Sequence, residues 1–103
     1  MRYRLAWSRT ADGRLMVLAD FLADRSRASA SRMVRRIRDA LLVLEEHPEA
    51  GPLWFDSEDM GIRRFIVDDY VVYYEVEPEQ RVIKIHSLHH GKESPPDPSA
   101  FQR

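Results

Sequence analysis

The sequence contains no cysteine, which excludes disulfide bonds and thiolate metal sites and makes a reducing compartment the simplest setting for the chain. It also lacks any run of about 20 apolar residues, the length that a membrane-spanning helix requires. The N-terminus, MRYRLAWSRT, has no apolar core of signal-peptide length. We therefore expect a cytoplasmic protein that makes no contact with a membrane.

Charge is distributed unevenly along the 103 residues, a length that suits a single domain. Residues 1–38 carry ten arginines and three acids, a balance of +7, whereas residues 39–103 carry six Lys or Arg and fourteen acids, a balance of −8. Halves of opposite charge indicate a polar surface suited to a charged partner. A solvated helix face is the alternative explanation.

The first part of the chain predicts a strand followed by a helical hairpin. Apolar and polar residues alternate over 3–8, as in a half-buried strand. Ser8 or Thr10 can cap a helix over about 11–24. A polar break follows, and apolar residues then recur at steps of three and four until His47-Pro48, where proline ends the second helix. A break this short predicts an antiparallel pair of helices.

The second part predicts a loop, three strands and a tail. Residues 48–61 are rich in Pro, Gly and acids and are expected to form a surface loop, which Leu53, Trp54 and Phe55 pin to the core. The strands are expected at 62–67, 70–77 and 81–88, joined by tight turns. Residues 93–103 contain SPPDPS and are expected to be extended or disordered.

The predicted fold is therefore α+β, with the order β-α-α-β-β-β and the helical hairpin packed on one face of a small, mainly antiparallel sheet. One domain is expected over residues 1–92, followed by the tail. The expected core consists of Leu5, Leu15, Leu18, Val34, Ile37, Leu41, Leu44, Phe65, Val72 and Ile85.

An ordered set of motifs resembles the RelE/ParE toxin superfamily, more closely its ParE-like branch. The set covers residues 3 to 92. It consists of Y-x-x-x-W-S-x-x-A from Tyr3 to Ala11, Leu44 with the Pro48-x-x-Gly51 step, GIRRFIVDDYVVYYEV at 61–76 and LHHGK at 88–92.

This resemblance implies a plasmid-stabilisation type of toxin–antitoxin system, in which a co-encoded antitoxin wraps the toxin with a flexible segment. Family members differ in their targets. ParE-like toxins bind DNA gyrase and trap its cleaved-DNA intermediate, whereas RelE-like toxins cut mRNA on the ribosome. The resemblance implies neither a cofactor nor a metal, and it leaves open a dimer or a toxin–antitoxin hetero-oligomer.

The residues favour the ParE-like activity over nuclease chemistry. In RelE-like nucleases the central strand resembles Y-R-L-V-Y, in which the arginine is catalytic. The matching run here is YVVYY at 70–74, so Val71 takes the place of that arginine. A second arginine of those nucleases falls near Gly91, and no tyrosine follows in 93–103. We therefore predict a protein that acts by binding and is not an enzyme, with His90, Gly91 and Lys92 contacting the target.

Three histidines near the end of the last strand support an alternative, a RelE-like endoribonuclease. On a regular strand His86 and His90 share a face and could act as base and acid, with Arg63 as the cation. The simpler explanation is that His90 belongs to a structural His-Gly pair, with His86 and His89 as ordinary strand residues. A zinc site is not expected, because ligands this close on one strand do not converge easily.

The antitoxin is expected to bind across the hairpin and the sheet through four arginines, Arg32, Arg35, Arg36 and Arg64. The simpler explanation is a solvated helix face for the first three and a structural ion pair for Arg64. A second alternative function is an inactive family member that serves as a co-repressor with its antitoxin.

Overall fold

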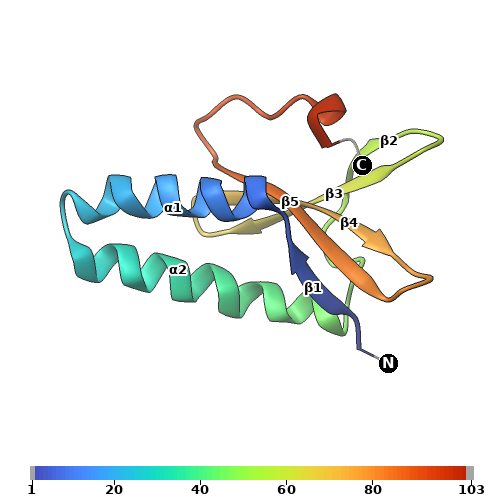
Figure 1. The fold of residues 1–103 in the computed structure, drawn as a ribbon, viewed down its shortest axis with the longest axis horizontal. Coiled ribbons are helices and arrows are strands. Elements are labelled where there is room, and N and C mark those ends of the chain that lie inside the picture. Colours follow the sequence, from blue (N-terminus) through green and yellow to red (C-terminus); the bar gives the residue numbers. More distant parts are fainter. Residues whose placement is uncertain (1, 102–103) are drawn as a thin grey trace.

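The computed structural model describes residues 2–101, which form a helical hairpin packed on a five-stranded sheet (Figure 1). The strand order is β1-β5-β4-β3-β2, with β1 parallel to β5 and the other neighbours antiparallel. The predicted α+β class is confirmed. In chain order the elements are β1 (Arg4–Trp7), α1 (Arg9–Ala23), α2 (Arg27–Leu41), η1 (Leu42–Glu45), β2 (Leu53–Asp56), β3 (Gly61–Val67), β4 (Tyr70–Glu77), β5 (Val82–His90) and η2 (Pro98–Phe101).

Serine side chains cap both helices. The Ser8 hydroxyl accepts a hydrogen bond from the Ala11 N–H at 3.0 Å, so of the two predicted caps Ser8 is confirmed, whereas Thr10 lies within α1. Ser26 caps α2 in the same way, accepting from the Ser29 N–H at 3.2 Å. The α-helical part of the second helix ends at Leu41, earlier than predicted, because its last turn tightens into the 3-10 turn η1.

Both helices pack against one side of the sheet, which we call the helix face. All ten predicted core residues contribute there. Leu15, Ile37, Leu41, Leu44, Val72 and Ile85 are buried, and Leu5, Leu18, Val34 and Phe65 are partly buried against them. The interior of this layer is apolar and continuous from the helices into β3, β4 and β5.

The prediction of a loop throughout 48–61 is wrong, because Leu53–Asp56 pairs with β3 as the edge strand β2. Its flanking Pro, Gly and acidic residues are typical of a loop, and only tertiary pairing with β3 makes it a strand. Trp54 and Phe55 pack against the sheet as expected. Leu53 does not, since it is 51% exposed.

The C-terminal segment folds back across the opposite side of the sheet, which we call the tail face (Figure 1). Its last turn, η2, buries Phe101 to 5% exposure against Ile62 and Tyr73. The sequence predicts an extended or disordered segment here. An apolar patch on the second face of a sheet favours a cover from elsewhere in the chain, and a lone aromatic in a Pro-rich tail does not reveal that contact.

The Pro48-x-x-Gly51 step joins the helices to the sheet through Tyr74. The buried Tyr74 hydroxyl accepts from the Gly51 N–H at 2.9 Å and donates to the Pro48 carbonyl at 2.8 Å. Gly51 is required sterically, because an added Cβ would lie 2.5 Å from the Arg64 carbonyl oxygen. This node fixes the entry into β2 and β3.

Candidate functional site

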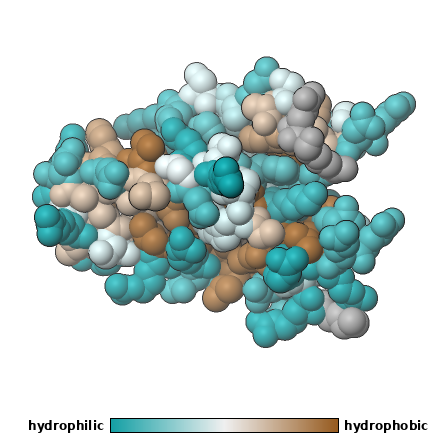
Figure 2. Space-filling view, in the orientation of Figure 1, coloured by the Kyte–Doolittle hydropathy of each residue, from teal (hydrophilic) through white to brown (hydrophobic). Residues whose placement is uncertain are grey.

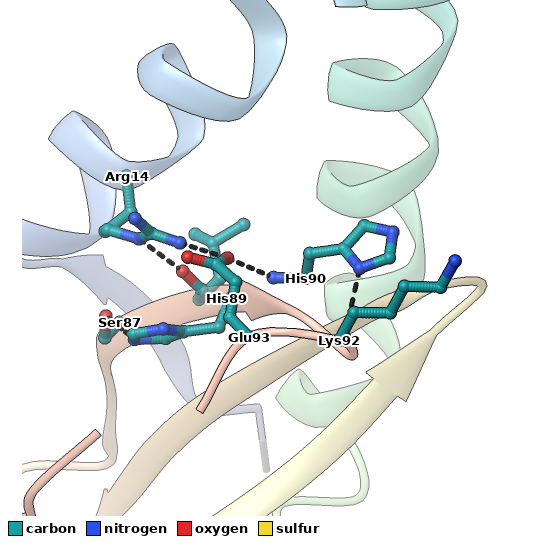
Figure 3. A network of polar contacts seen from close by, with 7 residues as sticks. Arg14, Ser87, His89, His90, Lys92 and Glu93 are labelled. Atoms are coloured by element: carbon teal, nitrogen blue, oxygen red, sulfur yellow. Dashed lines mark hydrogen bonds and ion pairs between the residues drawn. The ribbon is translucent and has the colours of Figure 1, made fainter. Parts of the chain in front are cut away.

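The turn that follows β5 is held to α1 by a network around Glu93 (Figure 3). The Arg14 guanidinium forms an ion pair with the Glu93 carboxylate and also donates to the Leu88 carbonyl at 2.9 Å. The same carboxylate accepts from the His90 N–H at 2.7 Å. One acidic side chain therefore connects the first helix, the last strand and the turn.

The predicted target-binding residues lie together on this turn. The Gly91 N–H donates to the Asp69 carbonyl at 2.7 Å, which ties the turn to the β3–β4 hairpin. The Lys92 N–H donates to the His90 ring at 3.1 Å, while the Lys92 side chain extends away from the network (Figure 3). Gly91 and Lys92 are exposed, so the turn presents a cation on a fixed backbone.

Glu93 is charged in this arrangement. Partial burial raises the pKa of the Glu93 carboxyl, but the hydrogen bond from His90 and the charge of Arg14 outweigh it, so the pKa lies below its usual value. A carboxylate held in its charged form keeps the Arg14 contact over the physiological pH range.

His89 points to the tail face from the same strand. Its ring nitrogen lies 3.0 Å from the Ser87 hydroxyl, and its ring meets Tyr73 edge-on at 5.7 Å. Burial, with the nearby Arg14 cation, lowers the pKa of the His89 imidazole. The neutral ring that results could accept a proton, but Ser87 is only 2% exposed and is therefore not accessible as a nucleophile.

A β-bulge separates His86 from His90. Tyr74 pairs with Ile85 and Tyr73 pairs with Ser87, so His86 is the extra residue between two pairs. His86 consequently stacks on Phe101 on the tail face, whereas His90 pairs with Tyr70 on the helix face. The expectation that His86 and His90 share a face is wrong, because it assumed an unbroken alternation.

His86 has a buried carboxylate partner instead. Its Nε2 lies 3.0 Å from an oxygen of Glu75, and the two side chains are 12% and 6% exposed. This pair lies under the Phe101 ring, whose centroid is 5.1 Å from that of His86. Glu75 is one of two buried polar residues among those described, the other being Ser87.

Arg63 lies apart from both histidines. It donates to the Gly51 carbonyl at 2.8 Å and lies 3.8 Å from Glu49, so it supports the loop before β2. Arg63 pairs with Tyr74 whereas His90 pairs with Tyr70, a separation of roughly 13 Å along β4 at about 3.3 Å per residue. His86, His90 and Arg63 therefore do not converge. Within residues 2–101, no group of three or more metal-ligating side chains is placed to hold an ion.

The four arginines predicted to bind the antitoxin lie on two different surfaces. Arg32, Arg35 and Arg36 are exposed along α2, where Arg36 forms an ion pair with Asp68 at 3.1 Å. Arg64 pairs with Tyr73 in the sheet and is therefore on the tail face, away from the helices. Only the first three can act as one surface.

Two open grooves border α2. One, of about 470 Å³, combines Ala19, Ala30, Ser31 and Val34 with Arg35 and Arg38. The other, of about 390 Å³, is lined by Arg32, Met33, Arg35, Arg36, Asp39 and Asp68. Figure 2 shows hydrophobic residues gathered over the hairpin among hydrophilic ones. The exposed Met16, Val17 and Phe21 add apolar surface along α1. None of the described helices is long and apolar enough to span a bilayer.

Sequence reasoning missed the residues that organise this site. Arg14 and Glu93 are 79 positions apart, and Glu75 and His86 are paired only through the sheet register. No local pattern joins either pair. The signal that could have found Glu75 is its place between Tyr74 and Val76 in a mainly apolar central strand, where an acid needs a buried partner.

Three solved structures with a similar fold come from toxin–antitoxin systems. The chain is similar to a structure of the chromosomal ParDE system from P. aeruginosa, with a TM-score of 0.70, 20% identity and coverage of 86% of this chain and 96% of that one. It is also similar to an archaeal RelE–RelB complex from Pyrococcus horikoshii, with a TM-score of 0.61, 24% identity and coverage of 91% of this chain and 100% of that one. The similarity to the RelBE2 complex from Mycobacterium tuberculosis has a TM-score of 0.56, with 18% identity and coverage of 87% of this chain and 99% of that one.

A family model agrees with this likeness. The model described as the ParE toxin of the type II toxin–antitoxin system, parDE, matches residues 5–95, most of the chain. No curated protein sequence matches significantly. The chain belongs to the ParE toxin family of type II toxin–antitoxin systems.

Proposed function

We propose that this ParE-type toxin acts in the cytoplasm by binding and poisoning DNA gyrase, through the turn of His90, Gly91 and Lys92, without chemistry of its own. The observation that carries the proposal is the separation of the candidate catalytic groups. An acid and a base must both reach one substrate. Here His86 is covered on the tail face and His90 lies on the helix face.

The turn has the features of a recognition element. Its backbone is fixed by Glu93 and by the Asp69 carbonyl, so little conformational freedom is lost on binding. Lys92 supplies an exposed positive charge next to this fixed backbone. Such an element suits an acidic or phosphate-bearing surface, as at a protein–DNA complex.

The test uses supercoiled DNA, gyrase and ATP in one reaction, and ribosomes with mRNA in the other. Wild-type toxin should produce linear, protein-linked DNA and leave the mRNA intact. Lys92→Glu should reduce the linear product at least about tenfold, since it reverses a contact charge. Arg27→Glu, the same charge change at an exposed position of the hairpin, should have no effect on the DNA reaction.

Specific mRNA cleavage without linear DNA would contradict the proposal. Loss of that cleavage in His86→Ala would identify the ribonuclease alternative. The observation favouring this alternative is the oriented His86–Glu75 pair, with His89 and Tyr73 on the same face. A chain inactive in both reactions that still binds its antitoxin would instead be a co-repressor.

We further propose that the antitoxin docks an amphipathic, acidic helix along the hairpin. The groove with Ala19 and Val34 offers an apolar floor, and Arg35 and Arg38 border it with positive charge. An antitoxin helix with an apolar stripe flanked by acidic residues would match both the apolar floor and the arginines. Arg64 is not part of this surface, because it lies on the tail face. The resulting assembly is a toxin–antitoxin hetero-oligomer.

A further inference from the structure

We propose that residues 93–101 form a releasable strap, which closes the tail face and must be displaced before any partner can reach the His86–Glu75 pair. This inference does not depend on gyrase being the target. It concerns a face of the sheet that the hairpin and the His90–Lys92 turn leave untouched.

The strap is anchored at its two ends and scarcely between them. At its start, Glu93 is fixed by Arg14 and by the His90 N–H. At its end, Phe101 is buried to 5% exposure. The residues between the anchors, 94–100, are exposed or only partly buried.

Beyond the Glu93 N–H, which donates to the His90 carbonyl at 2.9 Å, the backbone of the strap makes no hydrogen bond to the sheet among the residues described. The Ala100 N–H donates to the Asp97 carbonyl and the Ser99 N–H donates to the Asp97 side chain, and both contacts are local. Pro95, Pro96 and Pro98 have no N–H to donate, and they stiffen the segment. The packing of Phe101 is therefore the main contact that holds the far end closed.

The Phe101 ring covers the polar groups of the tail face. It stacks on His86 with an interplanar angle of 15° and lies 6.3 Å from Tyr73, centroid to centroid. Without it, the His86 ring would meet solvent, with Glu75 behind it at 3.0 Å. The far end of the strap, which is held mainly by the packing of Phe101, can open locally while the sheet stays folded, because the core on the helix face does not include it.

Chemical labelling of histidine by diethyl pyrocarbonate tests the strap in the full-length protein. His47 is exposed and serves as the internal reference. In wild type, His86 should react at least about tenfold more slowly than His47, because it is covered by a buried aromatic ring. In Phe101→Ala, His86 should react within about threefold of His47, since the cover is lost.

Phe21→Ala is the matched control, because Phe21 is 62% exposed on α1 and its loss should leave the His86 rate unchanged. Phe101→Leu keeps apolar volume and should give an intermediate rate, which supplies a reading if circular dichroism shows that Phe101→Ala is unfolded. Slow labelling of His86 in a folded Phe101→Ala protein would overturn the proposal, as would equal rates for His86 and His47 in wild type.

Release without unfolding is tested by amide hydrogen exchange on the wild-type protein. Diethyl pyrocarbonate should label His86 fully in a time over which the amides of β4 and β5 are still protected from hydrogen exchange. Labelling that proceeds only at the exchange rate of those amides would mean that His86 is uncovered by global unfolding, and the strap would then not be a separate moving part.

Discussion

The two faces of the sheet are covered in different ways. On the helix face, two fifteen-residue helices bury a cluster of twelve described residues, all of them apolar or aromatic. On the tail face, one 3-10 turn covers a cluster of three, Ile62, Tyr73 and Phe101. Glu75 and Ser87, the buried polar residues, contact His86 and His89 on the tail face.

This difference separates the face that carries most of the buried apolar surface from the face that has a small cover. A continuous apolar layer stabilises the fold most, since the hydrophobic contribution is roughly proportional to the apolar area removed from water. Buried polar groups cost free energy unless they are paired, and on the tail face Glu75 and Ser87 have the partners His86 and His89. The helix face therefore determines whether the protein folds, and the tail face can change without unfolding it.

The largest expected effect is a loss of stability on the helix face. Leu41→Ala removes a side chain that is fully buried between the hairpin and the sheet, and it should lower the free energy of unfolding by about 2–5 kcal/mol. Leu42→Ala, at a neighbouring position that is 50% exposed, should cost less than about 1 kcal/mol. Urea denaturation measures both.

The same measurement on Phe101→Ala tests the comparison directly. After the Phe101 side chain is shortened, the tail can move to fill the space. The loss in the free energy of unfolding should therefore be clearly smaller than for Leu41→Ala. A loss as large as that of Leu41→Ala would contradict the division between the two faces.

Two adjacent tyrosines provide the next test, because they point to opposite faces of β4. Tyr74→Phe removes the hydroxyl that bonds Gly51 and Pro48 and leaves a buried N–H unpaired, so it should cost about 1–3 kcal/mol. The Tyr73 hydroxyl has no hydrogen bond to any of residues 2–101, and Tyr73→Phe should be nearly neutral. Equal losses in thermal denaturation would show that the Gly51 contact is not made.

The fold could be predicted from the sequence largely because its signals are local. Apolar spacing in the helices, alternation in the strands and Pro48 each report on a few neighbouring residues. Strand β2 could not be predicted, because its pairing with β3 comes from tertiary contacts and its flanking residues resemble a loop. The burial of Phe101 is likewise a long-range contact.

The candidate site was less predictable for the same reason. The histidines and the turn at 90–92 were visible in the sequence, but their directions depend on a single bulge at His86. One inserted residue reverses the alternation beyond it and separates His86 from His90. Arg64 was grouped with the arginines of α2 by charge alone, and the register of β3 places it on the other face.

A smaller effect is expected on antitoxin affinity, and it distinguishes the two surfaces by charge. Arg35→Glu reverses a charge that lines both grooves of the hairpin and should weaken binding of the antitoxin by about tenfold at low salt. The loss should shrink at high salt, where exposed charges are screened. Isothermal titration at two ionic strengths gives both values.

Arg64→Glu makes the same charge change on the tail face and should leave the dissociation constant unchanged. If Arg64→Glu weakens binding as much as Arg35→Glu does, the antitoxin contacts both faces, and the proposed docking along the hairpin alone is wrong.

The smallest expected effect is a pH dependence of stability that originates on the tail face. Burial, with the charge of Arg14, lowers the pKa of His89 in the folded protein below its ordinary value of 6.5. The unfolded chain therefore binds a proton at higher pH than the folded chain does. The contribution of His89 to stability is complete above pH 6.5 and is lost as pH falls from there through the folded pKa. His89→Gln removes the titrating group, so the melting temperature of the variant should fall less than that of wild type between pH 7.5 and 5.5. An equal fall of the melting temperature in the variant and in wild type across this range would mean that the His89 ring is solvated in the folded protein.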